Sequence, residues 1–285
     1  MERLSFLVQL ALVIHKVVLW DLFLEDMIKI SAVVITFNEE KSISRCINSL
    51  KSVAEEIIVV DSFSKDTTKA ICLNAGVQFV EHIFEGHIQQ KNFALTLASY
   101  DFVLSLDADE YLSEELIDSI KQAKNNSTHQ AYSMNRLTGI AGRWIYSTDW
   151  YPDRKIRLWN KAIGKWGGYN PHDTVILNTG ISVSHLKGNL MHDGYEDYLD
   201  LMTKANQYAK IFARAHQHKK SSSVFKVLYK SIFTFFRNYI IKFGFMSGFD
   251  GLVISFTNTW YTFFKYAMLR ELNKSQKVRE GDETK

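Results

Sequence analysis

Proline and cysteine are scarce in this chain. Its 285 residues include 2 prolines and 2 cysteines, and 46% of the residues are hydrophobic. This composition excludes a linker-rich or disordered protein, and the length suits one large domain with an appendage or two modest domains. Cys46 and Cys72 have neither CxxC spacing nor the histidine pattern of a zinc site. We therefore expect two reduced thiols on buried helix faces.

Acidic residues are absent from one long stretch. The formal net charge of +3 is too small to indicate nucleic-acid binding, so no nucleic-acid partner is expected. Between Lys204 and Phe249, however, the chain contains no Asp or Glu. The basic residues of that stretch are Lys204, Lys210, Arg214, Lys219, Lys220, Lys226, Lys230, Arg237 and Lys242.

The N-terminal segment lacks an uninterrupted apolar run. Residues 4–24 are mostly apolar, but polar side chains interrupt them at Gln9, His15, Lys16 and Asp21. A spanning helix needs about 20 predominantly apolar residues, and no small-residue cleavage site follows the segment. Residues 1–26 are therefore either an amphipathic surface anchor or a leader upstream of a functional start at Met27. We expect their removal to leave activity intact.

From Met27 onward, short apolar runs alternate with helical patterns. Strands are predicted at residues 30–35, 57–60, 77–80 and 102–106. Helices are predicted at residues 43–50, 89–98 and 196–218. Another helix is predicted to begin after the N-cap residues 64–67 and to end at Gly76, and a further one to begin after Ser113. This alternation predicts an α/β fold with a mainly parallel central sheet. We assign residues 27–200 to a catalytic domain and residues 201–285 to a helical, basic and aromatic C-terminal region.

Polar residues follow three of the predicted strands. Thr36 follows the first, Asp61 ends the second, and Asp107 and Asp109 follow the fourth. Ligands of parallel sheets bind beyond the carboxyl ends of the strands, so these side chains should converge on one rim. The first turn reads TFNEE and has no GxGxxG, which argues against a nicotinamide cofactor bound to a glycine-rich loop.

The carboxylates of Asp107 and Asp109 alternate with Ala108. An isolated D-x-D is most often a solvated turn, but after a buried strand it suits a hard divalent ion. Mg²⁺ or Mn²⁺ takes one or two carboxylates and completes its coordination with phosphate oxygens and water. A nucleotide diphosphate bridged in this way becomes a better leaving group.

Ordered motifs along the chain resemble those of glycosyltransferase family 2, and more narrowly its lipopolysaccharide core β-glucosyltransferase branch. The motifs are residues 31–40 (SAVVITFNEE), 56–62 (EIIVVDS), 90–92 (QKN), 104–110 (LSLDADE), 142–144 (GRW), 150–153 (WYPD), 157–159 (RLW), 171–173 (PHD), 190–192 (LMH) and 260–266 (WYTFFKY). The resemblance covers nearly everything after Met27. It implies a GT-A fold, a Rossmann-like arrangement for nucleotide-diphospho-sugar transfer.

The resemblance also implies roles for individual residues. Asp61 would accept a hydrogen bond from the nucleotide base, and Thr36 and Glu39 would line the nucleoside pocket. Lys91 would lie near the diphosphate. Asp107 would face the ribose or the metal, and Asp109 would be the direct metal ligand.

The candidate site residues further along the chain each have two alternative roles. Asp173 is either the general base, one methylene shorter than the family's usual Glu, or a turn residue after Pro171. His192 either completes the metal site or has a structural role, and Arg157 either neutralises the diphosphate or pairs with a core carboxylate. The aromatic side chains that either stack on acceptor sugars or pack in the core are Trp144, Trp150 and Tyr151.

The C-terminal region combines apolar and basic residues at near-helical spacing. The apolar set is Phe225, Leu228, Ile232, Phe235, Phe236 and Tyr239. Such a helix either lies in an anionic membrane surface or packs on the catalytic domain with a solvated basic face. Residues 243–269 are long enough to span a membrane but contain Asp250, Asn258 and several hydroxyls, so we expect an interfacial location.

These observations predict a metal-dependent, inverting hexosyltransferase. The resemblance points to UDP-glucose as donor and a lipopolysaccharide inner-core glycolipid as acceptor, at the cytoplasmic face of the inner membrane. Two alternatives stay open. One is a family 2 transferase acting on a polyprenyl-phosphate or capsule acceptor, and the other is a non-catalytic, membrane-associated protein that binds nucleotide sugars.

Overall fold

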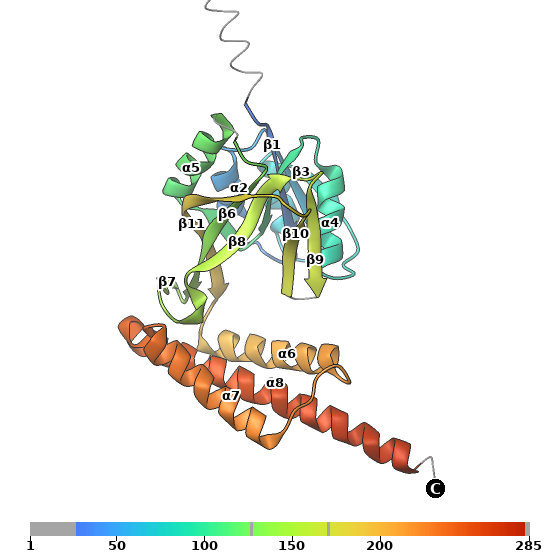
Figure 1. Cartoon of the computed structure of the whole chain (residues 1–285). Helices are drawn as coiled ribbons and strands as arrows, with labels where there is room; N and C mark the ends of the chain where they lie inside the picture. The colour runs from blue at the N-terminus through green and yellow to red at the C-terminus, as the bar shows by residue number, and fades with distance from the viewer. Residues whose placement is uncertain (1–26, 126–127, 170–171, 283–285) are drawn as a thin grey trace, which may run out of the picture. The chain divides into compact units, whose positions relative to one another are not determined.

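The computed structural model of the chain describes residues 27–125, 128–169 and 172–282. The predicted leader or anchor at residues 1–26 lies outside the described residues. The chain forms two compact units (Figure 1). The first contains the described residues up to Met134 and Ile156–Gly188, and the second contains Asn135–Lys155 and the residues from Asn189 onward. The proposed boundary between residues 200 and 201 stays a prediction.

The first unit is built on four parallel strands. These are β1 (Ile30–Thr36), β2 (Glu56–Asp61), β3 (Gln78–Glu81) and β4 (Phe102–Asp107). β1 pairs in parallel with β2 on one side and with β4 on the other, and β2 pairs in parallel with β3. β1 and β4 are buried along almost their whole length. Continuous β-branched and leucine-rich runs are typical of strands covered on both faces, as the sequence predicted.

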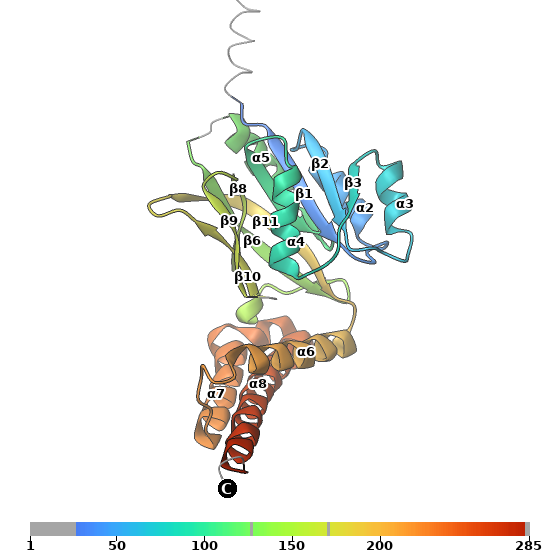
Figure 2. The same cartoon turned by 90° about the vertical axis from the view of Figure 1, so that its right-hand side faces the viewer.

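Helices cover both faces of these strands (Figures 1 and 2). α4 (His87–Leu97) lies on one face, and α2 (Ile43–Leu50) and α5 (Glu114–Asn125) lie on the other. α2 buries Ile43, Cys46, Ile47 and Leu50, the four residues whose helical spacing predicted it. α3 (Thr68–Asn74) ends before Gly76, whose φ of 71° permits the reversal of the chain. The Ser113 hydroxyl caps α5 at the amide of Leu116, 3.3 Å away.

The sheet is mixed, so the expectation of a mainly parallel sheet was wrong. Within the described residues its strand order is β3-β2-β1-β4-β8-β6-β11-β5, with β7 paired to β6. β8 runs antiparallel to β4, and β7 runs antiparallel to β6. The added strands are β5 (Glu110–Leu112), β6 (Ala131–Ile140), β7 (Arg143–Trp144), β8 (Asp153–Asn160) and β11 (Val183–Tyr195). From β6 to β11 the described part of the chain contains no α-helix, and a parallel pair usually needs one as its crossover connection.

A separate antiparallel hairpin joins the first unit. β9 (Gly164–Tyr169) pairs with β10 (His172–Leu177), and Asp173 lies opposite Gly168 in the register. Trp166 and Val175 of the hairpin are buried in one cluster with Val103 of β4 and Ala94 of α4. This packing holds the hairpin against α4.

The second unit is mainly helical. Its elements are η1 (Thr148–Trp150), α6 (Tyr198–His216), α7 (Val224–Phe236), η2 (Arg237–Ile241), η3 (Gly244–Ser247) and α8 (Gly248–Asp282). The predicted helix at 196–218 is thus confirmed as α6. No single described helix is long and apolar enough to cross a membrane. The segments Val224–Ile241 and Gly244–Lys274 together meet that test of length and composition, and they are bent by 68°.

Candidate active site

The carboxyl ends of β1, β2 and β4 form the rim predicted from the sequence. Thr36 lies opposite Asp61 in the pairing of β1 with β2, and Ile35 lies opposite Asp107 in the pairing of β1 with β4. The parallel register therefore places one acidic residue on each side of the end of β1. This convergence was predicted from strand ends alone and is confirmed.

The turns after β1 and β2 are joined by hydrogen bonds. The Asp61 carboxylate accepts from the Ser64 amide at 2.7 Å and from the Ser64 hydroxyl, and it is almost fully buried. The Glu39 amide donates to Thr68 Oγ1 at 2.9 Å. Thr36 Oγ1 is buried and makes no hydrogen bond to the described residues. A buried hydroxyl without a partner is uncommon in proteins, and it suits a position that a ligand completes.

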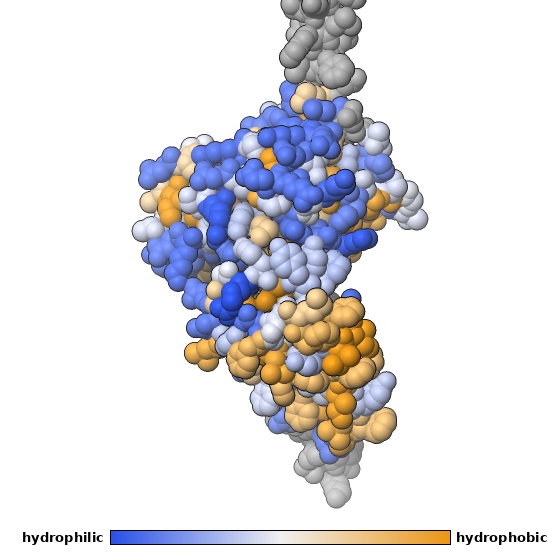
Figure 3. All heavy atoms as spheres, turned by 90° about the vertical axis from the view of Figure 1, so that its left-hand side faces the viewer, coloured by the Kyte–Doolittle hydropathy of each residue, from blue (hydrophilic) through white to orange (hydrophobic). Residues whose placement is uncertain are grey.

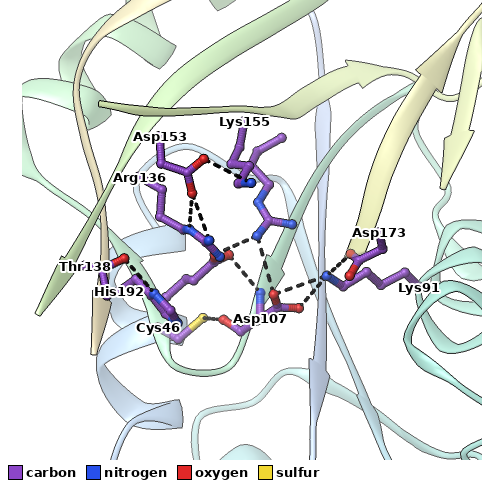
Figure 4. Close-up of polar contacts among 11 residues, drawn as sticks. Cys46, Lys91, Asp107, Arg136, Thr138, Asp153, Lys155, Asp173 and His192 are labelled. Carbon is purple, nitrogen blue, oxygen red and sulfur yellow. Dashed lines mark hydrogen bonds and ion pairs between the residues drawn. The ribbon is translucent and has the colours of Figure 1, made fainter. Parts of the chain in front are cut away.

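Lys91 joins two acidic residues at this rim. Its Nζ lies 2.8 Å from Asp107 Oδ1 and 2.7 Å from Asp173 Oδ2 (Figure 4). The side chain of Lys91 is only 2% exposed, whereas those of Asp107 and Asp173 are 29% and 13% exposed. A buried ammonium group needs such charge compensation, because desolvation alone is costly. The bridge brings Asp173 of β10 to the end of β4.

Arg157 forms a second buried ion pair at the end of β4. Its guanidinium lies 2.6 Å from Glu110 Oε1 and 3.4 Å from Asp107 Oδ2. Burial by itself would lower the pKa of Arg157, but the carboxylates of Glu110 and Asp107 outweigh it and hold that pKa above its ordinary value. Glu110 also accepts a hydrogen bond from the Asp107 amide at 3.1 Å. Arg157 therefore pairs with carboxylates in this structure, and its predicted role at the diphosphate stays a prediction.

Trp166 packs against both cations. Its ring centroid is 4.3 Å from Lys91 Nζ and 5.2 Å from the guanidinium carbon of Arg157. The electron-rich face of an indole attracts cations within about 6 Å. Trp166 reaches this position because β9 approaches β10 closely, where Gly167 leaves space that a Cβ would take from Ile176. The hairpin thus supplies both Trp166 and Asp173.

No role was predicted from the sequence for Glu110 or Trp166. Glu110 was visible as the residue after the D-x-D, but nothing in the spacing indicates that it is fully buried against Arg157. Trp166 is 75 positions from Lys91 in the chain, and their contact depends on the packing of the β9–β10 hairpin against α4.

Both cysteines are buried, as expected, and neither is bonded to the other. Burial, reinforced by the carboxylates of Glu110, Asp109 and Asp107, raises the pKa of the Cys46 thiol well above its ordinary value. Burial, with a contribution from Asp61, raises the pKa of Cys72 to about 11. Both side chains are therefore neutral thiols behind the acidic rim.

A divalent ion fits the rim together with a phosphate ligand. Three carboxylates (Asp107, Glu110 and Asp173) face two cations (Lys91 and Arg157), before Asp109 is counted. No group of three or more His, Cys, Asp or Glu side chains among the described residues is arranged to hold a metal ion. A Mg²⁺ ion here would therefore need oxygen ligands from a substrate phosphate beside one or two carboxylates.

Several predicted residues belong to the second unit. His192 lies on β11, and its Nδ1 is 3.2 Å from Thr138 Oγ1. Trp150 stacks on Tyr195 with ring centroids 5.0 Å apart, and the Tyr151 hydroxyl donates to Asn189 at 3.1 Å. The functions predicted for these residues stay predictions, as does the role of Asp109.

Comparisons with known proteins identify the family. The description "Glycosyl transferase family 2" matches residues 31–189. The chain is 35% identical over 267 residues to the uncharacterized glycosyltransferase RT0209 of Rickettsia typhi, covering 89% of this chain and 91% of the relative. It is 27% identical over 253 residues to the lipopolysaccharide core biosynthesis glycosyltransferase LpsC of Rhizobium meliloti, covering 84% and 91%.

Among solved structures, S. aureus TarS is similar with a TM-score of 0.42 and 15% identity, covering 87% of this chain and 55% of that one. The rim of polar strand ends and the family match together define a nucleotide-sugar transferase with a GT-A-like fold and a mixed sheet. The chain belongs to glycosyl transferase family 2.

Proposed function

We propose that this glycosyltransferase moves a hexose, glucose from UDP-glucose, onto an inner-core sugar of a lipopolysaccharide glycolipid with inversion at the anomeric carbon. The similarity to LpsC, which is named for lipopolysaccharide core biosynthesis, supports this acceptor class. The observation that carries the proposal is the Lys91 bridge between Asp107 and Asp173, because it links a donor-binding strand end to a candidate base.

Asp173 is the general base of the proposed reaction. Its carboxylate removes the proton from an acceptor hydroxyl as that oxygen attacks the anomeric carbon. The new C–O bond forms on the face opposite the nucleotide, the bond from the anomeric carbon to the diphosphate oxygen breaks, and UDP leaves with the electron pair. The proton passes from Asp173 to solvent. No protein nucleophile takes part, so the configuration inverts.

Lys91 and Arg157 stabilise the leaving diphosphate electrostatically. Both are cations in a buried site, where a fixed charge acts more strongly than it would in water. In this structure their partners are Asp107, Glu110 and Asp173. An incoming diphosphate offers further negative oxygens to the same two cations, which leaves Asp173 available to the acceptor hydroxyl.

Asp109, with Asp107 and the oxygens of the diphosphate, would hold a Mg²⁺ or Mn²⁺ ion. Such an ion supplies positive charge that neutralises a diphosphate leaving group. The nucleoside would lie against Thr36, Glu39 and Asp61. The Thr36 hydroxyl supports this assignment, because it has no hydrogen-bond partner in the described part of the chain.

The acceptor is expected to be held at an anionic membrane surface, on the cytoplasmic face of the inner membrane. Support comes from the second unit, in which α7 exposes Phe225, Leu228 and Ile232 (79%, 51% and 70%). The basic residues of the same stretch have no acidic neighbours in sequence between Lys204 and Phe249. Basic residues near an exposed apolar helix face suit peripheral binding to anionic lipid.

A transfer assay with purified protein tests the proposal. UDP-glucose is offered with three acceptors separately: a lipopolysaccharide core glycolipid, a polyprenyl phosphate and a capsule intermediate. We expect a β-linked product with the core glycolipid, identified by NMR of the anomeric proton. A product formed with polyprenyl phosphate alone would show that the proposed acceptor is wrong. The assignment to a family 2 transferase would then still stand.

Asp109→Asn tests the catalytic role of the carboxylate pair. We expect transfer to fall by at least about a hundredfold, while circular dichroism and the melting temperature stay near those of the wild type. Asp101→Asn is the matched control, because Asp101 is an exposed aspartate immediately before the opposite end of β4. Unchanged turnover in Asp109→Asn would contradict the assignment and favour a non-catalytic binding protein.

A further inference from the structure

The second unit contains a cavity to which the proposed reaction assigns no role. Its volume is about 760 Å³, within the range of about 300–1,000 Å³ typical of small-molecule sites. One wall is the segment from Trp144 to Pro152, and the other is the bend between α7 and α8, residues 241–250. Both walls belong to the same unit.

Hydrogen bonds hold the two walls together. Ser147 Oγ and Ser247 Oγ are 2.6 Å apart, and the Thr148 amide donates to the Lys242 carbonyl at 2.9 Å. Close packing of glycines fixes the bend itself, because a Cβ on Gly251 would lie 1.8 Å from the Gly244 carbonyl oxygen. The cavity is thus preformed, which lowers the entropic cost of binding.

The rim of the cavity is apolar and exposed. Tyr146, Ile241, Phe243 and Met246 are 61%, 51%, 58% and 73% exposed. Figure 3 shows hydrophobic side chains gathered over the helical part of the chain. Large contiguous apolar surface is rare on soluble proteins and marks sites for apolar partners. A ligand at this cavity therefore has a hydrocarbon portion that covers the rim.

Two charged residues, Asp250 and Lys242, line the cavity. The Asp250 carboxylate is paired with Arg143 at 2.7 and 2.8 Å and accepts from the Tyr198 hydroxyl at 2.5 Å. The hydrogen bond from Arg143 lowers the pKa of Asp250, although burial opposes it, so this carboxylate is ionised and already compensated. Lys242 makes no ion pair with the described residues and is the uncompensated charge of the wall. A negatively charged head group of a ligand would therefore pair with Lys242.

We propose that this cavity binds an anionic amphiphile, with its hydrocarbon chain on the rim of Ile241, Phe243 and Met246 and its anionic head group at Lys242. The inference rests on the proposed function, because a glycolipid acceptor with an anionic group next to its acyl chains is such a molecule. The cavity then holds the lipid end of the acceptor, which is a separate task from sugar transfer.

Calorimetric titration with dodecyl phosphate, kept below its micelle concentration, tests the site in the full-length protein. We expect one molecule bound per chain, with dodecyl maltoside at least fivefold weaker and inorganic phosphate without measurable binding. Phe243→Ser should weaken binding about tenfold and Lys242→Ala about fivefold. The matched controls Phe225→Ser and Lys219→Ala change an exposed aromatic and an exposed lysine outside the cavity, and they should bind as the wild type does.

The outcomes distinguish failure of ligand binding at the cavity from failure of the proposed sugar transfer. Equal weakening by Phe243→Ser and Phe225→Ser would mean general adsorption to the apolar surface and would overturn the site. Equal affinity for dodecyl maltoside would overturn its preference for anions. Asp109→Asn should bind dodecyl phosphate normally while losing transfer. A wild type that binds the probe but transfers no sugar would therefore refute the proposed function and leave the cavity standing.

Discussion

Asp173 is the residue on which the proposed chemistry depends most. Its carboxylate lies 2.7 Å from Lys91 Nζ and is 13% exposed, so the ion pair both holds it in place and leaves an edge open to a substrate. The resemblance of the sequence motifs implies a Glu at this position, and Asp is one methylene shorter. The bridge through Lys91 brings the carboxylate to the end of β4 despite the missing methylene.

Asp173→Asn should reduce kcat by about 10²–10⁴-fold, because a positioned general base contributes that much. The donor-induced thermal shift should change little, since Asp173 faces the acceptor in this account. Asp173→Glu should retain measurable turnover. The exposed carboxylate Glu81, paired with Lys69 at 3.2 Å, supplies the control Glu81→Gln. Wild-type kcat in Asp173→Asn would exclude Asp173 as the base.

Glu110 is expected to matter for stability. It is fully buried against Arg157, and removing one partner of a buried pair costs about 3–5 kcal/mol. Glu110→Gln should therefore lower the free energy of unfolding by about 3 kcal/mol in urea denaturation. Glu81→Gln removes one partner of a pair whose side chains are 51% and 37% exposed, so it should cost less than about 1 kcal/mol. Similar losses in both variants would contradict a structural role specific to Glu110.

Residue roles were predictable from the sequence only in part. The convergence of Thr36, Asp61 and Asp107 follows from where parallel strands end, so it could be predicted. The pairing of Arg157 with Glu110 joins residues 47 positions apart through an antiparallel strand, and no local pattern encodes it. The contact of Trp166 with Lys91 likewise depends on tertiary packing.

At the scale of elements, the α/β half was easier to predict than the rest. Buried apolar runs and helical periodicity located β1, β2, β4 and α2 closely. No bounds were predicted for the strands β6, β8 and β11, because their burial alternates irregularly and their partners are remote in sequence. This is why the sheet was expected to be mainly parallel.

α8 contains a lysine in an apolar setting. Lys265 Nζ lies 4.2 Å from the Tyr261 ring centroid and 5.2 Å from that of Phe212. Burial, with repulsion from Lys220 and Lys230, lowers the pKa of Lys265 from 10.5 to about 8. Below pH 8 the folded chain holds this charge at a cost. The cost is relieved as the pH rises from 8 towards 10.5, because the folded amine loses its proton before the unfolded one.

Lys265→Met should therefore stabilise the chain at pH 7 by on the order of 1–2 kcal/mol. The gain over the wild type should shrink between pH 8 and pH 10.5. Urea unfolding at pH 7, 9 and 10.5 measures it, and Lys219→Met is the control at an exposed lysine. A gain that is constant with pH would show that packing and not charge burial determines the effect.

At the scale of the whole molecule, the two compact units have different proposed tasks, sugar transfer in the first and lipid binding in the second. The first carries the rim of Asp61, Asp107 and Asp173 with its two buried cations. The second carries the basic, apolar helices and the cavity beside the α7–α8 bend. Sequence composition indicated part of the second unit, because residues 204–249 contain no Asp or Glu. It could not indicate the cavity, which forms between segments about 100 residues apart.

Binding of the nucleotide sugar with a divalent ion tests the central claim most directly. The melting temperature of the wild-type protein is measured with UDP-glucose, with Mg²⁺ or Mn²⁺, and with both. Ligand bound to the folded state alone stabilises it by about 2.7 kcal/mol at a hundredfold excess over Kd. We expect a clear rise with donor and metal together, lost in Asp109→Asn and kept in Asp101→Asn. No metal-dependent rise with UDP-glucose or any other nucleotide sugar would contradict the account.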